Sequence, residues 1–157
     1  MTSTPSPQAP RPAPLKRTDF KAFLDIPTRW MDVDIYGHVN NVQYLSFFDT
    51  AVNSWYIANG LLDPVKGTEI FLVVETGCHY FSEITFPDTV TAGLRIEKLG
   101  SSSVVFRVGL FAGEASETAA HGCFVHVLVD RRERRPTPIS EQKRNVLAQL
   151  TAAPGTA

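Results

Sequence analysis

The longest regular pattern of hydrophobic positions has the period of an α-helix. From Asn41 to about Asn59, apolar side chains recur at steps of three and four residues. They form a wide stripe that consists of Tyr44, Leu45, Phe48, Ala51, Val52, Trp55 and Tyr56, broadened by Phe47 and Ile57. Gly60 follows at the position where a left-handed residue ends many helices. The pattern therefore predicts one long helix that is buried on most of its circumference.

On both sides of this helix the hydrophobic positions alternate instead, which is typical of β-strands. A first strand is expected near Phe23–Met31, followed by a loop over Asp32–Val39. After the helix, four strands separated by short turns are expected at Ile70–Ser82, Val90–Glu97, Val104–Ala112 and Ala119–Asp130. A short helix near Ile139–Leu150, with Ser140 as candidate cap, closes the chain.

A strand, a helix and then a run of strands predict an α+β fold rather than an α/β fold. A helix that is apolar on nearly all sides needs an antiparallel sheet of about five strands wrapped around it, which is the hotdog arrangement. A single wrapped helix leaves a sheet edge and a helix face open. We therefore expect a homodimer or a dimer of dimers.

The 157 residues are enough for one domain with a core of its own, expected over residues 19–150. Residues 1–18 include five prolines among small polar residues and predict a disordered tail, and residues 151–157 are expected to be loose. The chain lacks both the ~20 consecutive apolar residues of a membrane helix and the pattern of a signal peptide. A cytoplasmic location is therefore expected.

Charge and cysteine content narrow the classes of partner. The net charge of −1 gives no electrostatic reason to expect nucleic acid or a membrane as a partner. Cys78 and Cys123 lie inside hydrophobic runs, which indicates buried thiols of a reducing compartment. Three histidines, His79, His121 and His126, are scattered on predicted strands. No metal site is expected from this spacing.

The segment with the most reactive side chains joins the first strand to the helix. Asn40 is a good N-cap, and Gln43 three residues later completes a capping-box pattern. The N–H groups of Asn41 and Val42 would then lack intrahelical acceptors and carry the positive end of the helix dipole. A carbonyl placed there would be polarised, and the oxyanion formed on attack would be stabilised.

A carboxylate precedes this helix start. Asp34 lies six residues before Asn40, on a loop that must turn back at Gly37, where a positive φ is permitted. It could attack the polarised carbonyl or draw a proton from water. The alternative is an Asx turn in which Asp34 caps local backbone. Asp32 alternates to the opposite side and is interpreted as structural, paired with Arg29.

From Arg29 to Tyr44 these residues form the motif Arg-Trp-x-Asp-x-Asp-x-x-Gly-His-Val-Asn-Asn-x-x-Tyr, followed by Phe-Phe-Asp-x-Ala. This motif resembles the 4-hydroxybenzoyl-CoA thioesterase-like branch of hotdog acyl-CoA thioesterases, and the resemblance covers about residues 22–148. It implies hydrolysis of an acyl-CoA, with Asp34 as the catalytic carboxylate and the backbone N–H of Asn41 as the oxyanion donor. It implies no cofactor, since coenzyme A is part of the substrate.

The sequence departs from the aromatic-CoA prototype at His38-Val-Asn-Asn, so 4-hydroxybenzoyl-CoA itself is not the expected substrate. A related branch carries its carboxylate on the helix, which keeps Asp49 as a second candidate. An acyl carrier protein as the acyl carrier, or non-catalytic acyl binding, are the alternative functions.

Further substrate contacts are expected from two groups of residues. In the motif they are Tyr36, Gly37, His38, Asn40 and Tyr44. After the last strand they are Arg131, Arg132 and Arg134, whose guanidinium forks suit the phosphates of coenzyme A. A solvated charged turn is the alternative for the arginines. His38 could act as a general base or could shape the loop, and Tyr44 is expected to pack below the site.

Overall fold

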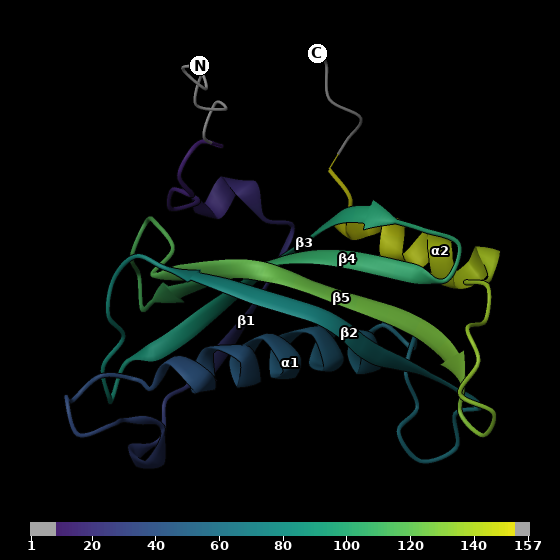
Figure 1. Cartoon of the computed structure of the whole chain (residues 1–157), viewed down its shortest axis with the longest axis horizontal. Helices are drawn as coiled ribbons and strands as arrows, with labels where there is room; N and C mark the ends of the chain where they lie inside the picture. Colours follow the sequence, from purple (N-terminus) through teal and green to yellow (C-terminus); the bar gives the residue numbers. More distant parts are fainter. Residues whose placement is uncertain (1–8, 153–157) are drawn as a thin grey trace, which may run out of the picture.

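The computed structural model describes residues 9–152 and contains one five-stranded antiparallel sheet in the order β1-β3-β4-β5-β2. The strands are β1 (Ala22–Pro27), β2 (Glu69–Tyr80), β3 (Thr89–Leu99), β4 (Ser103–Ala112) and β5 (Ala120–Asp130). Helix α1 (Asn41–Ala58) lies along one face of the sheet, and α2 (Glu141–Leu147) packs beside β3 and contributes Leu147 to the same core (Figure 1). The expected α+β hotdog arrangement is confirmed.

Helix α1 forms where the sheet can bury the apolar stripe that the sequence predicts. Its inward side chains are buried against sheet residues such as Phe106 and Leu110. The helix ends at Ala58 with Asn59 as its C-cap, and Gly60 has the expected positive φ of 71°. The burial is less complete than predicted, because Val42 and Ile57 are exposed and Trp55 is only partly buried. One side of the helix therefore has no cover within the described part of this chain.

The first strand is shorter than predicted. β1 stops at Pro27, and the expected continuation to Met31 is replaced by a 3-10 helix, η2 (Trp30–Asp32). The carboxylate of Asp32 accepts a hydrogen bond from the Arg29 N–H at 2.7 Å, which closes this turn. The side chain of Asp32 thus ends the extended conformation that the hydrophobic alternation favoured.

The described part of the predicted tail differs from the expectation. Residues 1–8 lie outside the described residues, but Leu15 exchanges two hydrogen bonds with Thr118, at 2.9 and 2.8 Å. Arg17 donates to the carbonyl oxygens of Gly113 and Ala115. At the other end, Thr151 forms a β-bridge with Ile96. Both segments are held by partners more than 50 residues away, which local composition does not reveal.

Phe20 anchors the N-terminal segment on the sheet. Gly93 and Gly109 are register partners on β3 and β4. A Cβ atom at Gly93 would lie 2.6 Å from the Phe20 ring, and one at Gly109 would lie 2.3 Å from it. The two glycines therefore create the depression that the ring fills.

A polar pair lies within the core between α1 and the sheet. The hydroxyl of Tyr56 and Nδ1 of His126 are 2.9 Å apart, and both residues are fully buried. Phe71 stacks on Tyr56, and Phe124 packs edge-on against His126. Burial raises the pKa of Tyr56 well above its ordinary value and lowers the pKa of His126 to about 4. Both groups are therefore neutral at pH 7.

This pair predicts a loss of stability in mild acid. An unfolded histidine titrates near pH 6.5, so below that pH the unfolded chain binds a proton that folded His126 accepts only near pH 4. The stabilisation by neutral His126 is complete above about pH 6.5. As the pH falls from this value to about 4, the free energy of unfolding decreases by up to about 1.4 kcal/mol per pH unit. Urea titrations at several pH values measure the slope. His126→Asn, which keeps a polar partner for Tyr56, should flatten it; an unchanged slope contradicts the assignment.

Candidate active site

The loop between η2 and α1 folds back on itself as a small hairpin. Val33 and Val39 form an antiparallel bridge, and the Asp34 N–H donates to the carbonyl of His38 at 3.0 Å. The Gly37 N–H donates to the carbonyl of Asp34, and Gly37 has a φ of 80°. The predicted reversal at Gly37 is confirmed, and a side chain there would be strained.

Asp32 fixes the base of this hairpin. Its fully buried carboxylate forms an ion pair with Arg29 at 2.8 Å. Burial raises the pKa of Asp32, but the hydrogen bonds and charge of Arg29 outweigh this effect and hold the pKa below its ordinary value. The carbonyl of Asp32 also accepts from the Asn40 N–H at 2.8 Å. Asp32 is therefore structural, as predicted.

The carboxylate of Asp34 is half-buried at the start of the turn. Its Oδ1 accepts a hydrogen bond from the Tyr36 N–H at 2.9 Å. This is the Asx turn that was the alternative interpretation of Asp34. Among the described residues, its Oδ2 has no hydrogen-bond partner. One oxygen thus orients the carboxylate while the other is available, so the turn and a chemical role are compatible.

The first turn of α1 exposes one backbone donor. The side chain of Asn40 accepts from the Val42 N–H at 3.1 Å, which confirms Asn40 as the N-cap and occupies this N–H. Within the described residues, the Asn41 N–H has no acceptor. The predicted reciprocal bond from Gln43 is replaced, because the Asn40 N–H donates to Asp32 instead.

Tyr80 on β2 is a residue that sequence reasoning did not identify. Its hydroxyl donates to the carbonyl of Asn41 at 3.0 Å, and its ring packs edge-on against Tyr44. Tyr44 is buried, as expected. Burial raises the pKa of Tyr80 to about 12, so the hydroxyl remains a donor at neutral pH. The helix start is therefore fixed by the sheet as well as by its cap.

A cavity of about 560 Å³ opens beside the hairpin. It is lined by Trp30, Val33, Asp34, Ile35, Gly37 and Phe86. Trp30 and Phe86 pack edge-on with ring centroids 5.7 Å apart, although both side chains are exposed. Asp34 is the charged residue of an otherwise apolar lining. Sequence reasoning missed Trp30 and Phe86; Trp30 stands within the motif, whereas Phe86 comes from a separate loop.

The other predicted residues of the motif take different roles. Nε2 of His38 lies 2.8 Å from a carboxylate oxygen of Glu83, so this imidazole points to Glu83. The side chain of Tyr36 is largely exposed. The alternative carboxylate Asp49 is exposed on α1 and bonds to Asn53 one turn later. Asp34 is therefore the carboxylate that lines the cavity, on the loop that precedes α1.

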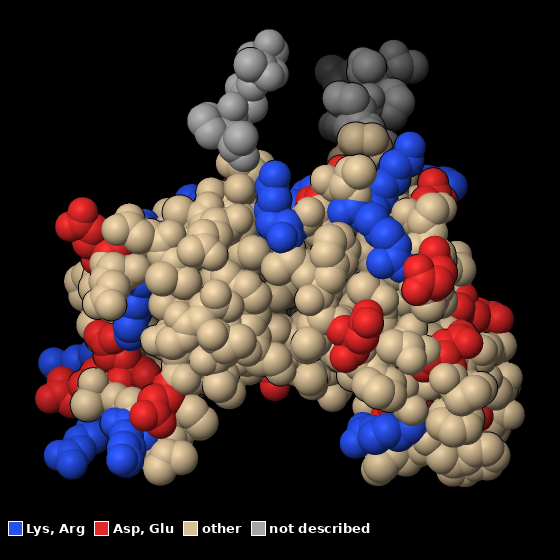
Figure 2. All heavy atoms as spheres, turned by 180° about the vertical axis from the view of Figure 1, so that it is seen from behind, with Lys and Arg blue, Asp and Glu red and all other residues tan. Residues whose placement is uncertain are grey.

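The predicted phosphate-binding arginines lie at the other end of the molecule. Arg131 donates to the carbonyls of Pro64 and Gly67, in the segment that follows the C-terminal end of α1. The 18 residues of α1, about 27 Å in length, separate this end from Asn41 (Figure 1). Figure 2 shows charged residues gathered at both ends and a largely uncharged middle. Within one chain, these arginines do not meet Asp34.

Arg132 and Arg134 nevertheless form a basic cavity of about 610 Å³ together with Lys66 and Arg131. Asp130 closes the turn by accepting from the Arg132 N–H, and Arg134 adopts a left-handed φ of 59°. The guanidinium of Arg131 is occupied by backbone carbonyls, so its main role is to hold the preceding loop.

Two further observations concern metal-binding groups and membrane-spanning helices. Within residues 9–152, no three His, Cys, Asp or Glu side chains gather as a metal-binding group. No helix in this described range is long and apolar enough to cross a membrane.

The two cysteines differ from the prediction in their burial. Cys78 and Cys123 are unpaired thiols, and they are half-buried, whereas full burial was predicted. Burial raises the pKa of Cys78 to about 11.

Comparison with known proteins identifies the family and proteins of similar structure. The family model of the thioesterase-like superfamily matches residues 28–150. A protein of Pseudomonas aeruginosa strain PAO1 is 46% identical, and its crystal structure superposes with a TM-score of 0.87 over 90% of this chain and 99% of that chain. A thioesterase from Thermus thermophilus, solved with coenzyme A and Zn, is 30% identical, with a TM-score of 0.71 over 84% of this chain and 95% of that chain.

The fold extends to more distant proteins. A 1,4-dihydroxy-2-naphthoyl-CoA thioesterase from Synechocystis has a TM-score of 0.72 at 18% identity, over 82% of this chain and 96% of that chain.

Substitution of Asp32 and substitution of Asp34 should have different effects on the free energy of unfolding. Asp32→Asn removes the charge that pairs with Arg29 from a buried position and should lower the free energy of unfolding by about 1–3 kcal/mol. Asp34→Asn keeps an oxygen for the Tyr36 N–H and should change it by less than about 0.5 kcal/mol. Denaturant unfolding of the two variants measures both values. Equal losses would mean that Asp34 has a structural role similar to that of Asp32.

Proposed function

Because the chain belongs to the thioesterase-like superfamily, we propose that it hydrolyses acyl-CoA thioesters with Asp34 as the reactive carboxylate. The observation that carries the proposal is the position of Asp34. Its carboxylate is oriented by the Tyr36 N–H, has one oxygen without a partner among the described residues and lines an apolar cavity. The available N–H of Asn41 lies a few residues along the chain, at the start of α1.

In this proposal the thioester carbonyl oxygen accepts a hydrogen bond from the Asn41 N–H, which stabilises the developing oxyanion. Two routes fit the available Oδ2 of Asp34. It takes a proton from a water molecule that attacks the carbonyl carbon, or it attacks this carbon itself and water hydrolyses the resulting anhydride. In both routes the thiolate of coenzyme A leaves. The reaction needs no cofactor beyond the coenzyme A of the substrate.

The cavity supports an apolar acyl group. Trp30, Ile35 and Phe86 present aromatic and aliphatic surface to it, and these side chains are exposed in the single chain. Burying them against an acyl group would contribute roughly 25 cal/mol per Å² of apolar area removed from water. We therefore propose the cavity as the acyl-binding site.

Within one chain the basic turn lies far from Asp34, and we propose that a homodimer brings arginines of one protomer to the Asp34 hairpin of the other. β2 is an edge strand, and Val73, Val74 and Tyr80 are exposed along it. We propose that two β2 strands pair antiparallel about a twofold axis near the middle of the strand. The Glu69 end of the partner's strand then lies beside Tyr80, because antiparallel strands run in opposite directions.

This pairing changes the geometry of the arginines. The basic turn with Arg132 and Arg134 adjoins the Glu69 end of β2, whereas Tyr80 adjoins the start of α1. In the dimer, the basic turn of one protomer therefore approaches the Asp34 hairpin of the other. We propose that the phosphates of coenzyme A bind there in trans, and we retain Arg132 and Arg134 for this role.

The cysteines bear on the location of the protein in the cell. Unpaired thiols fit a reducing compartment, and we propose the cytoplasm.

The hydrolytic role of Asp34 is tested by thiol release from a panel of acyl-CoAs. Asp34→Asn should lower kcat by at least about 10²-fold, because an amide neither accepts the proton nor attacks the carbonyl. Asp49→Asn is the matched control and should retain full activity. Equal rates for wild type and Asp34→Asn would remove Asp34 from the mechanism. Release from no acyl-CoA would leave acyl carrier protein substrates or non-catalytic binding.

The proposed site across the dimer predicts complementation. Asp34→Asn dimers should be inactive, and dimers of the Arg132→Ala, Arg134→Ala double variant should have a strongly raised KM. Mixing the two chains by unfolding and refolding creates heterodimers in which one of two sites has both wild-type groups. Low-KM activity should therefore reappear. If Asp34 and the arginines acted within one chain, each heterodimer site would carry a defect, and mixing would restore nothing.

A further inference from the structure

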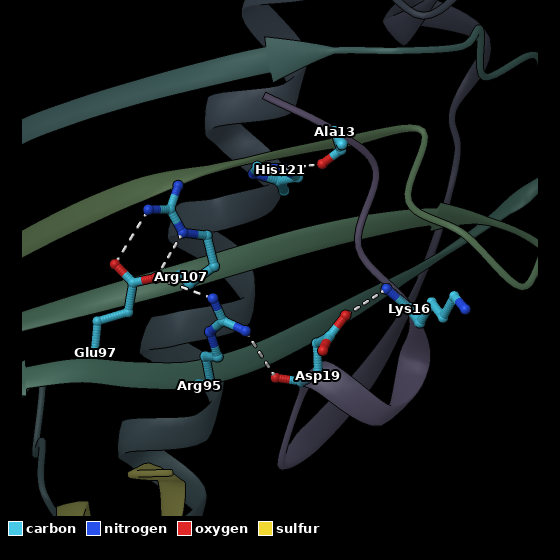
Figure 3. A network of polar contacts seen from close by, with 7 residues as sticks. All are labelled: Ala13, Lys16, Asp19, Arg95, Glu97, Arg107 and His121. Atoms are coloured by element: carbon cyan, nitrogen blue, oxygen red, sulfur yellow. Dashed lines mark hydrogen bonds and ion pairs between the residues drawn. The ribbon is translucent and has the colours of Figure 1, made fainter. Parts of the chain in front are cut away.

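The face of the sheet that points away from α1 carries four basic side chains, which we call the outer basic cluster: Arg95, Arg107, His79 and His121. Figure 3 shows the cluster without His79. Arg95 and Arg107 are register partners on β3 and β4. His79 and His121 are register partners on β2 and β5. Like charges at directly paired positions repel each other, so two adjacent arginines require compensating negative charge.

One carboxylate compensates the two guanidinium groups. Glu97 accepts two hydrogen bonds from Arg107, at 3.0 and 3.1 Å, and one from Arg95 at 3.1 Å. The carboxylate of Asp19 is directed to the Lys16 N–H instead, and Arg95 reaches only the carbonyl of Asp19 (Figure 3). The cluster therefore keeps a net positive charge and N–H groups of both arginines that Glu97 does not use.

A cavity of about 390 Å³ lies between the outer basic cluster and the segment Pro12–Leu15. This segment, which we call the N-terminal strap, crosses the sheet in front of His121 (Figure 3). The hydrogen bonds between Leu15 and Thr118 hold one end of the strap. The cavity thus has a basic floor of side chains from neighbouring strands and a wall of proline and alanine residues.

His121 gives the cavity a second property. Its side chain is only 6% exposed, and its Nε2 lies 2.8 Å from the carbonyl oxygen of Ala13. A carbonyl only accepts hydrogen bonds, so Nε2 carries a proton. Among the described residues, Nδ1 is a buried atom without a partner. Burial, with the nearby charges of Arg107 and Arg95 and the adjacent His79, lowers the pKa of His121, so the neutral ring offers Nδ1 as an acceptor.

A ligand that satisfies this cavity must accept hydrogen bonds from guanidinium groups and donate one to an imidazole nitrogen. A carboxylate offers only acceptors. A protonated phosphate offers several acceptor oxygens and a P–O–H donor in one tetrahedral group, and arginine forks suit such oxygens. We propose that the cavity under the N-terminal strap is a binding site for inorganic phosphate. Inorganic phosphate retains a P–O–H group at pH 7, whereas a phosphate monoester, with a second pKa of about 6, has mostly lost its own.

Occupation of this site would also secure the strap. A phosphate held by Arg95 and Arg107 that donates to Nδ1 joins the sheet to the residue that binds Ala13. The site lies on the face opposite α1 and is independent of the proposed hydrolysis at Asp34.

Phosphate binding is measured with the full chain by isothermal titration with inorganic phosphate at pH 7 and constant ionic strength. Wild type should show saturable binding. Arg107→Gln should weaken it at least about tenfold, the loss expected for a charge-assisted hydrogen bond, and Arg107→Lys should weaken it less. Lys98→Gln changes an exposed basic residue of β3 outside the cavity and is the matched control, which should bind as wild type does. Arg132→Gln shows whether any binding comes from the other basic cavity. Loss with Arg132→Gln but not with Arg107→Gln overturns the assignment, as does the absence of saturable binding.

Two further ligands distinguish the chemistry and its source. Acetate should not compete with phosphate, because it lacks a hydroxyl donor; effective competition overturns the role of His121. Glycerol 3-phosphate should bind more weakly than inorganic phosphate, because most of it carries no P–O–H at pH 7; equal or tighter binding overturns the role of His121. His121→Phe should abolish the preference for phosphate over acetate, and circular dichroism melting verifies that each variant is folded.

Discussion

The burial of α1 is the constraint on which the rest of the structure depends. Its apolar side chains can leave water only if a sheet covers them, and residues such as Phe106 and Leu110 on β4 provide this cover. The sheet must curve to do so, and it covers only one side of the helix. Val42, Ile57 and the exposed part of β2 are the consequence. The same requirement that creates the fold thus leaves a surface that a second protomer can bury.

The position of α1 also determines where the proposed chemistry lies. Its cap, Asn40, is held by the carbonyl of Asp32, and Asp32 is held by Arg29. Tyr80 fixes the same helix start from the edge strand. Rigid support from both sides leaves the Asn41 N–H in a defined direction, which electrostatic stabilisation of an oxyanion requires. The proposed reactive groups and the supporting groups are therefore separate residues within one short segment, and only the supporting aspartate is buried.

The two faces of the sheet differ in what covers them. The inner face meets α1 through large apolar residues, whereas the outer face has glycines at positions 93 and 109 that admit the ring of Phe20. Beside this ring, Arg95, Arg107 and His121 lie beneath a strap of backbone and proline. A polar outer face under a covering segment gives the molecule a second cavity whose chemistry is unrelated to that of the apolar cavity at Asp34.

The sequence by itself determined the order of elements, the helix with its cap at Asn40, the reversal at Gly37 and the structural role of Asp32, because each depends on residues close together in the chain. The pairing of His38 with Glu83, the contribution of Phe86 to the cavity and the bond from Tyr80 to Asn41 join residues more than 35 positions apart. Local patterns contain no information on such contacts. Composition likewise predicted a disordered tail over residues 1–18, where Leu15 and Arg17 find partners in the turn between β4 and β5. Only the tertiary structure decided that the arginine turn and Asp34 lie at opposite ends of α1, because the separation follows from how the sheet aligns its strands with the helix.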